Sequence, residues 1–258
     1  MISHIELGIQ LEEQERYQEA IAEYHLALLE EPRNPEPLIK KGTLLNDLGE
    51  FEPALQALTD ALNMRSGDYV ALVVRGDVYS SLKQYEEAIA DFTKAISIDS
   101  DDVEPYYNRG LAYANIGQVA QAIQDFTEAI RIDQQHGGAY NNRGLAFFRI
   151  GDYPAALADF TQAVTVRTGF ACSYTHRARV YEALGDKTNA MEDYDRALAI
   201  SPTDATALFF RGALYFAAND PEQGRSDYEA LIKTAPLDNQ FRALTLKKLE
   251  SLGTSKQI

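Results

Sequence analysis

The chain has 258 residues, a formal net charge of −15 at pH 7 and one cysteine, Cys172. The negative charge argues against nucleic-acid binding, because phosphates require clustered Lys and Arg side chains, and it disfavours binding to an anionic membrane surface. A single cysteine excludes an internal disulfide and fits a reducing compartment, so we expect a cytoplasmic protein.

The N-terminal stretch MISHIELGIQLEEQERY has no basic region before an apolar core, so it is not a secretory signal. No apolar run in the chain reaches the roughly 18 residues of a membrane-spanning helix. The stretch instead begins a pattern that returns every 34 residues. The small residue at position 8 of each repeat recurs as Gly8, Gly42, Gly76, Gly110, Gly144, Ala178 and Gly212.

Seven repeats fill residues 1–238 without an insertion and leave a tail, 239–258. The repeats are 1–34, 35–68, 69–102, 103–136, 137–170, 171–204 and 205–238. Small residues at positions 8, 20 and 27 let two helices approach closely, and an aromatic residue at position 24 fills the space beside them. Glycine at position 15 is typical of the residue that follows a helix end; it occurs as Gly49, Gly117, Gly151 and Gly185.

This pattern resembles the tetratricopeptide repeat family, in which each unit is a helix, a turn and a second antiparallel helix. The resemblance implies an all-α fold, a right-handed α-solenoid of seven helix-turn-helix units. Residues 239–252 predict a C-terminal capping helix followed by a frayed tail, with Phe241, Leu244 or Thr245, Leu249 and Leu252 over the open end. Arg242, Lys247 and Lys248 of that helix are expected to face water.

The first three repeats carry net charges of −6, −3 and −4, so most of the acidity lies there. This acidity either keeps the protein in solution or attracts a basic segment of a partner. Arg recurs at position 7 and Asp or Glu at position 23, which predicts a structural ladder of ion pairs. Pairing within repeats, as in Arg75–Asp91, and pairing between repeats, as in Arg109–Asp91, fit the sequence equally well.

In the family, the first helices line a concave groove through positions 2, 5, 6, 9, 12 and 13. The resemblance therefore implies that a protein or peptide partner binds there. The residues that we expect to form this site are Tyr107, Asn108, Leu111, Asn141, Asn142, Leu145, Phe148, Arg149, His176, Arg179, Phe209 and Phe216. The alternative for the apolar members is that they pack into the seam between helices.

Asn108 and Asn142 can each donate to and accept from the backbone of an extended peptide. The alternative is that each is a surface asparagine hydrogen-bonded to the adjacent helix. Arg149 and Arg179, with His176 beside them, predict an inward basic cluster that binds a carboxylate next to an apolar anchor. The alternative is that the two arginines only neutralise Glu182. The residues around Asn142 lack the Lys, Asn and Arg set with which family members bind chaperone C-terminal tails, so we expect no such binding.

Nothing in the sequence predicts catalysis, a cofactor or a metal site. The four histidines lie in four repeats without metal-ligand spacing, and Cys172 with His176 lacks the further groups of a nucleophilic site. We therefore expect a non-catalytic scaffold or adaptor, similar to stand-alone bacterial, cyanobacterial-style members that assist complex assembly. The alternative is a regulatory or targeting module of a larger enzyme or signalling system. We expect a self-contained monomer, with self-association through the end repeats as the alternative.

Overall fold

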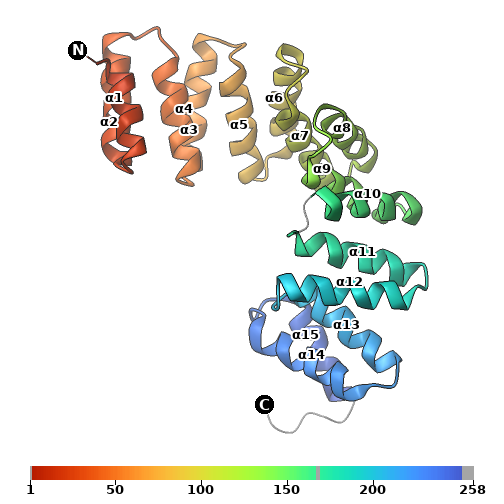
Figure 1. Cartoon of the computed structure of the whole chain (residues 1–258). Coiled ribbons are helices and arrows are strands. Elements are labelled where there is room, and N and C mark those ends of the chain that lie inside the picture. The colour runs from red at the N-terminus through yellow and green to blue at the C-terminus, as the bar shows by residue number, and fades with distance from the viewer. Residues whose placement is uncertain (1, 167–168, 252–258) are drawn as a thin grey trace. The chain divides into compact units, whose positions relative to one another are not determined.

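The computed structural model describes residues 2–166 and 169–251, and in these residues its regular structure is fifteen α-helices (Figure 1). The first helices of the repeats are α1 (His4–Glu13), α3 (Glu36–Asp47), α5 (Tyr69–Ser81), α7 (Val103–Asn115), α9 (Gly137–Arg149), α11 (Ala171–Ala183) and α13 (Ala205–Ala217). The second helices are α2 (Tyr17–Glu30), α4 (Phe51–Met64), α6 (Tyr85–Ile98), α8 (Val119–Ile132), α10 (Tyr153–Val166), α12 (Lys187–Ile200) and α14 (Pro221–Thr234). The last helix is α15 (Gln240–Ser251).

The helices form two compact units, Met1–Gln134 with α1–α8 and Gln135–Ile258 with α9–α15. Within each unit, the two helices of a repeat pack together, and the second helix also packs against the first helix of the next repeat. Each repeat thus buries its apolar side chains against its neighbours in the chain. The all-α solenoid expected from the sequence is confirmed. Leu252, which was expected to complete the cap, and the tail 253–258, which was expected to fray, lie outside the described residues.

The close approach of helices depends on the small residue at position 8. A Cβ atom added to Gly110 would lie 2.7 Å from the ring of Phe126, and one added to Gly8 would lie 2.5 Å from the ring of Tyr24. Both rings are almost completely buried. A larger residue at position 8 would therefore displace a packed ring, so the glycines are needed for the close approach of the two helices.

The turn after each first helix has one conformation in all seven repeats. Position 15 adopts a positive φ at Gly49, Gly117, Gly151 and Gly185, with values of 75° to 82°. The same position has φ between 59° and 61° at Glu15, Lys83 and Asn219. Residues other than glycine and asparagine rarely adopt this conformation, so two of the seven turns, at Glu15 and Lys83, contain residues that disfavour it.

The Arg–Asp ladder pairs within repeats. Arg75 contacts Asp91 at 2.7 Å and Arg109 contacts Asp125 at 2.8 Å. The second compact unit repeats this arrangement; its pairs are Arg143–Asp159, Arg177–Asp193 and Arg211–Asp227. Pairing within repeats and pairing between repeats fitted the sequence equally well. The contacts in the structure show that the arginines pair within their own repeats.

The last helix packs against α13 and α14. The Phe241 ring lies 5.1 Å from the Phe209 ring, and Thr245 and Leu249 are buried. The expectation that Arg242 faces water was wrong, because its Nη1 donates to the carbonyl oxygens of Ile232 and Ala235 at the end of α14. These carbonyls have no partner within α14, so a nearby guanidinium satisfies them.

Candidate partner-binding faces of the first helices

We use the term first-helix face for the surface that positions 2, 5, 6, 9, 12 and 13 of the first helices form within one compact unit. Neighbouring first helices contact one another in both units: α3 with α5, α5 with α7, α9 with α11, and α11 with α13. These contacts bring side chains from successive repeats together.

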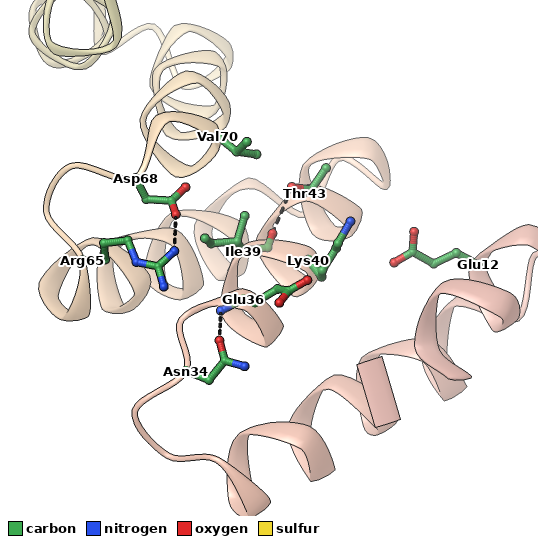
Figure 2. Close-up of a pocket in the computed structure, with 9 residues that line it drawn as sticks. All are labelled: Glu12, Asn34, Glu36, Ile39, Lys40, Thr43, Arg65, Asp68 and Val70. Carbon is green, nitrogen blue, oxygen red and sulfur yellow. Dashed lines mark hydrogen bonds and ion pairs between the residues drawn. The ribbon is translucent and has the colours of Figure 1, made fainter. Parts of the chain in front are cut away.

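A pocket of about 420 Å³ opens on the face of the N-terminal unit (Figure 2). Ile39, Lys40 and Thr43 of α3 line it, and Figure 2 shows the Glu12 carboxylate pointing toward this helix from α1. The wall formed by the α4–α5 connection carries an ion pair between Arg65 and Asp68, 3.2 Å long. The pocket therefore combines both charge signs with an apolar floor.

A second pocket of about 300 Å³ lies further along the same face, lined mainly by α5 and α7. Asn108 Nδ2 donates to Asp77 Oδ1 across it, at 2.9 Å. The pKa of Asp77 is raised from 3.8 to about 6, mainly by burial and in smaller part by the charge of Glu104, whereas the Asn108 hydrogen bond opposes the shift. Leu111 of α7 also lines this pocket.

Two predicted site residues therefore meet at this pocket, Asn108 and Leu111. Tyr107, the third predicted residue of α7, is half-buried, and its ring lies 5.9 Å from the Phe126 ring in the core of its repeat. Asp77 was not among the predicted site residues. The sequence could have indicated Asp77, because it places a carboxylate at position 9, whereas the next two repeats have Leu111 and Leu145 there.

In the C-terminal unit, Arg179 on α11 lies against two aromatic rings from the neighbouring first helices. Its guanidinium carbon is 5.0 Å from the centroid of the Phe148 ring and 5.1 Å from that of Phe210. Both distances are within the range of a cation–π interaction. The half-buried Arg179 makes no hydrogen bond or ion pair with the residues that the structure describes. Phe210, like Asp77, was missing from the predicted site.

The alternative role for Arg179, neutralising Glu182, has little support in this geometry. Glu182 accepts a hydrogen bond from the Tyr194 hydroxyl instead. Its pKa is raised by burial, and the Tyr194 hydrogen bond and the charge of Arg179 only oppose that shift. The Arg179 guanidinium thus affects Glu182 only through its charge. Its N–H donors make no hydrogen bond with the described residues.

His176 does not add a positive charge to this cluster. Its Nδ1 lies 3.0 Å from Asn141 Oδ1, and the Ser173 hydroxyl donates to the same oxygen at 3.0 Å. Burial, with a smaller effect of Arg179, lowers the pKa of His176 to about 4. His176 is therefore neutral at neutral pH and donates from Nδ1, since the amide oxygen only accepts. The predicted basic cluster is reduced to its arginines.

Three predicted site residues are less accessible than expected. Asn141 is 6% exposed and Phe209 is 9% exposed. The Phe209 ring packs on Phe210, Tyr228 and Phe241, and the half-buried Phe216 packs on Tyr228 at 5.2 Å. The rings of Phe209 and Phe216 pack into the seam between helices, which was the alternative expectation for the apolar residues of the site.

The remaining predicted residues lie on α9. Leu145 and Phe148 are half-buried and pack against a small core cluster of Ala156, Phe160 and Val180. Asn142 is half-buried and Arg149 is exposed at the end of the helix. The C-terminal unit thus brings Phe148 and Arg179 together.

A nucleophilic site does not form around Cys172. Burial raises the pKa of its thiol, which disfavours the reactive thiolate, and the Nδ1 of His176 is engaged by Asn141. Within the part of the chain that the structure describes, no cluster of His, Cys, Asp and Glu could hold a metal ion. None of the described helices has the length and apolar character needed to cross a bilayer.

The fold is that of a helical repeat protein. In this class, successive repeats contribute side chains to a shared surface that can contact other molecules. Family models described as TPR repeat and tetratricopeptide repeat match residues 76–117, 103–136, 137–168 and 173–204. The chain belongs to the tetratricopeptide repeat family. Comparison with the curated proteins found no match.

Solved structures with the same fold include a tetratricopeptide repeat protein from Parabacteroides merdae. It is 22% identical with a TM-score of 0.72, over 94% of this chain and 96% of that chain. YrrB, described as a TPR protein with an unusual peptide-binding site, is 24% identical with a TM-score of 0.64, over 73% of this chain and 97% of its own. Cut9, from a complex with Hcn1, is 14% identical with a TM-score of 0.71, over 95% of this chain and 51% of that chain. These likenesses support the fold.

Proposed function

We propose that the protein is a non-catalytic interaction scaffold that binds a segment of a partner protein on its first-helix faces. The observation that carries this proposal is Arg179, whose guanidinium lies about 5 Å from the rings of Phe148 and Phe210. Three successive repeats supply these side chains. A half-buried cation with unused donors suits a ligand that brings a carboxylate.

The rings and the guanidinium have complementary roles in this proposal. Phe148 and Phe210 hold the guanidinium in place and offer an apolar surface to a side chain of the partner. Arg179 can then donate two parallel hydrogen bonds to a carboxylate from its planar fork. The preferred partner is therefore an extended or helical segment with an acidic residue, or a C-terminal carboxylate, next to an apolar residue. YrrB, with its peptide-binding site, offers a precedent on the same fold.

A peptide array tests this function with pairs of peptides that differ only in Asp against Asn, or Glu against Gln. We expect the wild-type protein to prefer the acidic member of each pair. The variant Arg179→Ala should lose that preference, with affinity for acidic peptides reduced about tenfold or more. Arg179→Lys should recover only part of it, because an ammonium keeps the charge but not the planar fork.

The matched control is Arg196→Ala, since Arg196 is an exposed arginine of α12 whose contacts with Glu192 and Asp193 are 3.9 and 3.7 Å long. This variant removes the same charge from a second helix, so its array should match the wild type. An Arg179→Ala array that also matches the wild type would contradict the proposed function of this face.

A further inference from the structure

We propose that the pocket of about 300 Å³ between α5 and α7 binds a cationic side chain, the ammonium of lysine or the guanidinium of arginine, of a partner protein. The pocket lies within the N-terminal unit, whose helices are shown in Figure 1. The pocket contains the carboxylate of Asp77, so it would bind a positive group, whereas Arg179 would bind a negative one. This inference rests on the proposed function only in taking the cation from a protein partner.

The amide oxygens of two asparagines in the pocket accept no hydrogen bond from the described residues. Asn108 Nδ2 is used by Asp77 Oδ1, and Asn115 Nδ2 is used by the carbonyl oxygen of Leu111, each at 2.9 Å. A carboxylate and a carbonyl can only accept, so these bonds fix the orientation of both amides. The amide oxygens of Asn108 and Asn115 are left as acceptors. No Lys, Arg or His lines the pocket.

Asp77 is the negative centre of this pocket. Among the described residues its hydrogen-bond partner is Asn108, and it forms no ion pair. Asp77 is half-buried, whereas the two fully buried aspartates of the same unit, Asp91 and Asp125, are each paired with an arginine. Burial of an unpaired carboxylate disfavours its charged form, and a bound cation would remove that penalty.

Ser80 supplies an independent observation. Ser80 lines the same pocket, and its Oγ atom is buried and has no hydrogen-bond partner in the described parts of the chain. A hydroxyl can both accept and donate, and buried hydroxyls are normally satisfied. A rotation of the Ser80 side chain toward the pocket would let this hydroxyl accept from a cation bound at Asp77.

The surroundings of the pocket favour a long cationic side chain. Tyr85, Leu111 and Ala112 give it an apolar wall, which suits the methylene stem of lysine or arginine. The first three repeats carry net charges of −6, −3 and −4, and this excess of one sign attracts cations to the surface. A volume of about 300 Å³ is at the lower end for ligand sites and suits one side chain.

Three capped tripeptides test the pocket by NMR: acetyl-Gly-Arg-Gly-amide, acetyl-Gly-Lys-Gly-amide, and the neutral analogue with citrulline in place of arginine. The side-chain amide signals of Asn108 and Asn115 report binding. We expect the signals to shift and then saturate as the concentration of the arginine or the lysine peptide is raised to roughly 50 mM. The citrulline peptide should cause no shift. The two cationic peptides also show which side chain is preferred.

The variant Asp77→Asn should weaken binding of the cationic peptide at least about tenfold. Its control, Glu87→Gln, removes an exposed carboxylate of the second helix α6 and should leave binding unchanged. A second measurement needs no variant: titration of the Asp77 carboxyl carbon in the wild-type protein should show a lower pKa when the cationic peptide is bound.

The proposal is overturned if the citrulline peptide shifts the amide signals as much as the arginine peptide, or if neither cationic peptide gives a saturable shift. Unchanged binding by Asp77→Asn, with an unchanged Asp77 pKa in the wild type, would also overturn it. These results concern the N-terminal unit alone. Loss of acidic-peptide binding at Arg179 is measured separately, so the two failures are distinguishable.

Discussion

Arg109 and Asp125 are joined by two parallel hydrogen bonds, from Nε and Nη2 of the guanidinium to the two carboxylate oxygens, each 2.8 Å long. The third guanidinium nitrogen, Nη1, donates to the Thr93 hydroxyl of the preceding repeat at 2.9 Å. Arg75 contacts Thr59 in the same way at 3.3 Å. One guanidinium therefore connects the two helices of its repeat and also reaches the repeat before it.

We expect Arg109→Ala to lower the free energy of unfolding by about 3 kcal/mol, because it leaves a buried carboxylate without its partner. The double variant Arg109→Met, Asp125→Leu should cost clearly less, since no charge is left unpaired. Urea denaturation followed by circular dichroism measures both. If the single variant were as stable as the wild type but failed to bind a partner, the ladder would belong to the binding site.

Lys83 offers a stabilising substitution. It holds a positive φ of 60° in the turn where four other repeats have glycine. Lys83→Gly should raise the free energy of unfolding by about 1 kcal/mol, since a side chain in this conformation is strained. The reciprocal variant Gly117→Lys should lower it by a similar amount. Thermal denaturation compares the pair, and a lower melting temperature for Lys83→Gly would mean that other Lys83 contacts outweigh the strain.

The contact of α15 with α13 predicts that Phe241 stabilises the C-terminal unit. Phe241 lies 5.1 Å from Phe209 and 5.8 Å from Phe210. Phe241→Ala should lower the unfolding free energy by about 2 kcal/mol and promote self-association, because it uncovers these rings. Leu244→Ala on the same helix is the control, since Leu244 is 49% exposed. Melting temperature and sedimentation velocity together check this; a monomer with unchanged melting temperature would contradict a capping role.

The repeat architecture could be predicted from the sequence because its determinants recur. A glycine at position 8 opposite an aromatic residue at position 24, as in Gly110 and Phe126, is visible at each step of 34 residues. The ladder partner could not be chosen, because Arg109 has an aspartate in its own repeat and one in the repeat before. Only the packed helices show which carboxylate the guanidinium reaches.

The site was harder to predict because burial depends on the neighbouring repeat. Asn141 has the position expected of a face residue, yet Ser173 and His176 from the next repeat bond to its oxygen and bury it. Asp77 was overlooked because position 9 varies between repeats, and its unpaired state is a property of the packed helices. Arg179 was predicted, whereas its contact with Phe210 required the orientation of α13.

Asp77 makes the stability of the protein depend on pH. Its pKa is raised from 3.8 to about 6, mainly by burial and with a further effect of Glu104. The folded protein therefore binds this proton more tightly than the unfolded chain. The resulting stabilisation is complete below about pH 4 and is lost as the pH rises through about 6.

The variant Asp77→Asn carries no such proton, so its stability relative to the wild type should increase as the pH is raised from 4 to 7, by about 2 kcal/mol. Urea denaturation of both proteins across this range measures the difference. A flat profile for Asp77→Asn would show that Asp77 is solvated, and a solvated carboxylate would weaken the case for a cation pocket between α5 and α7.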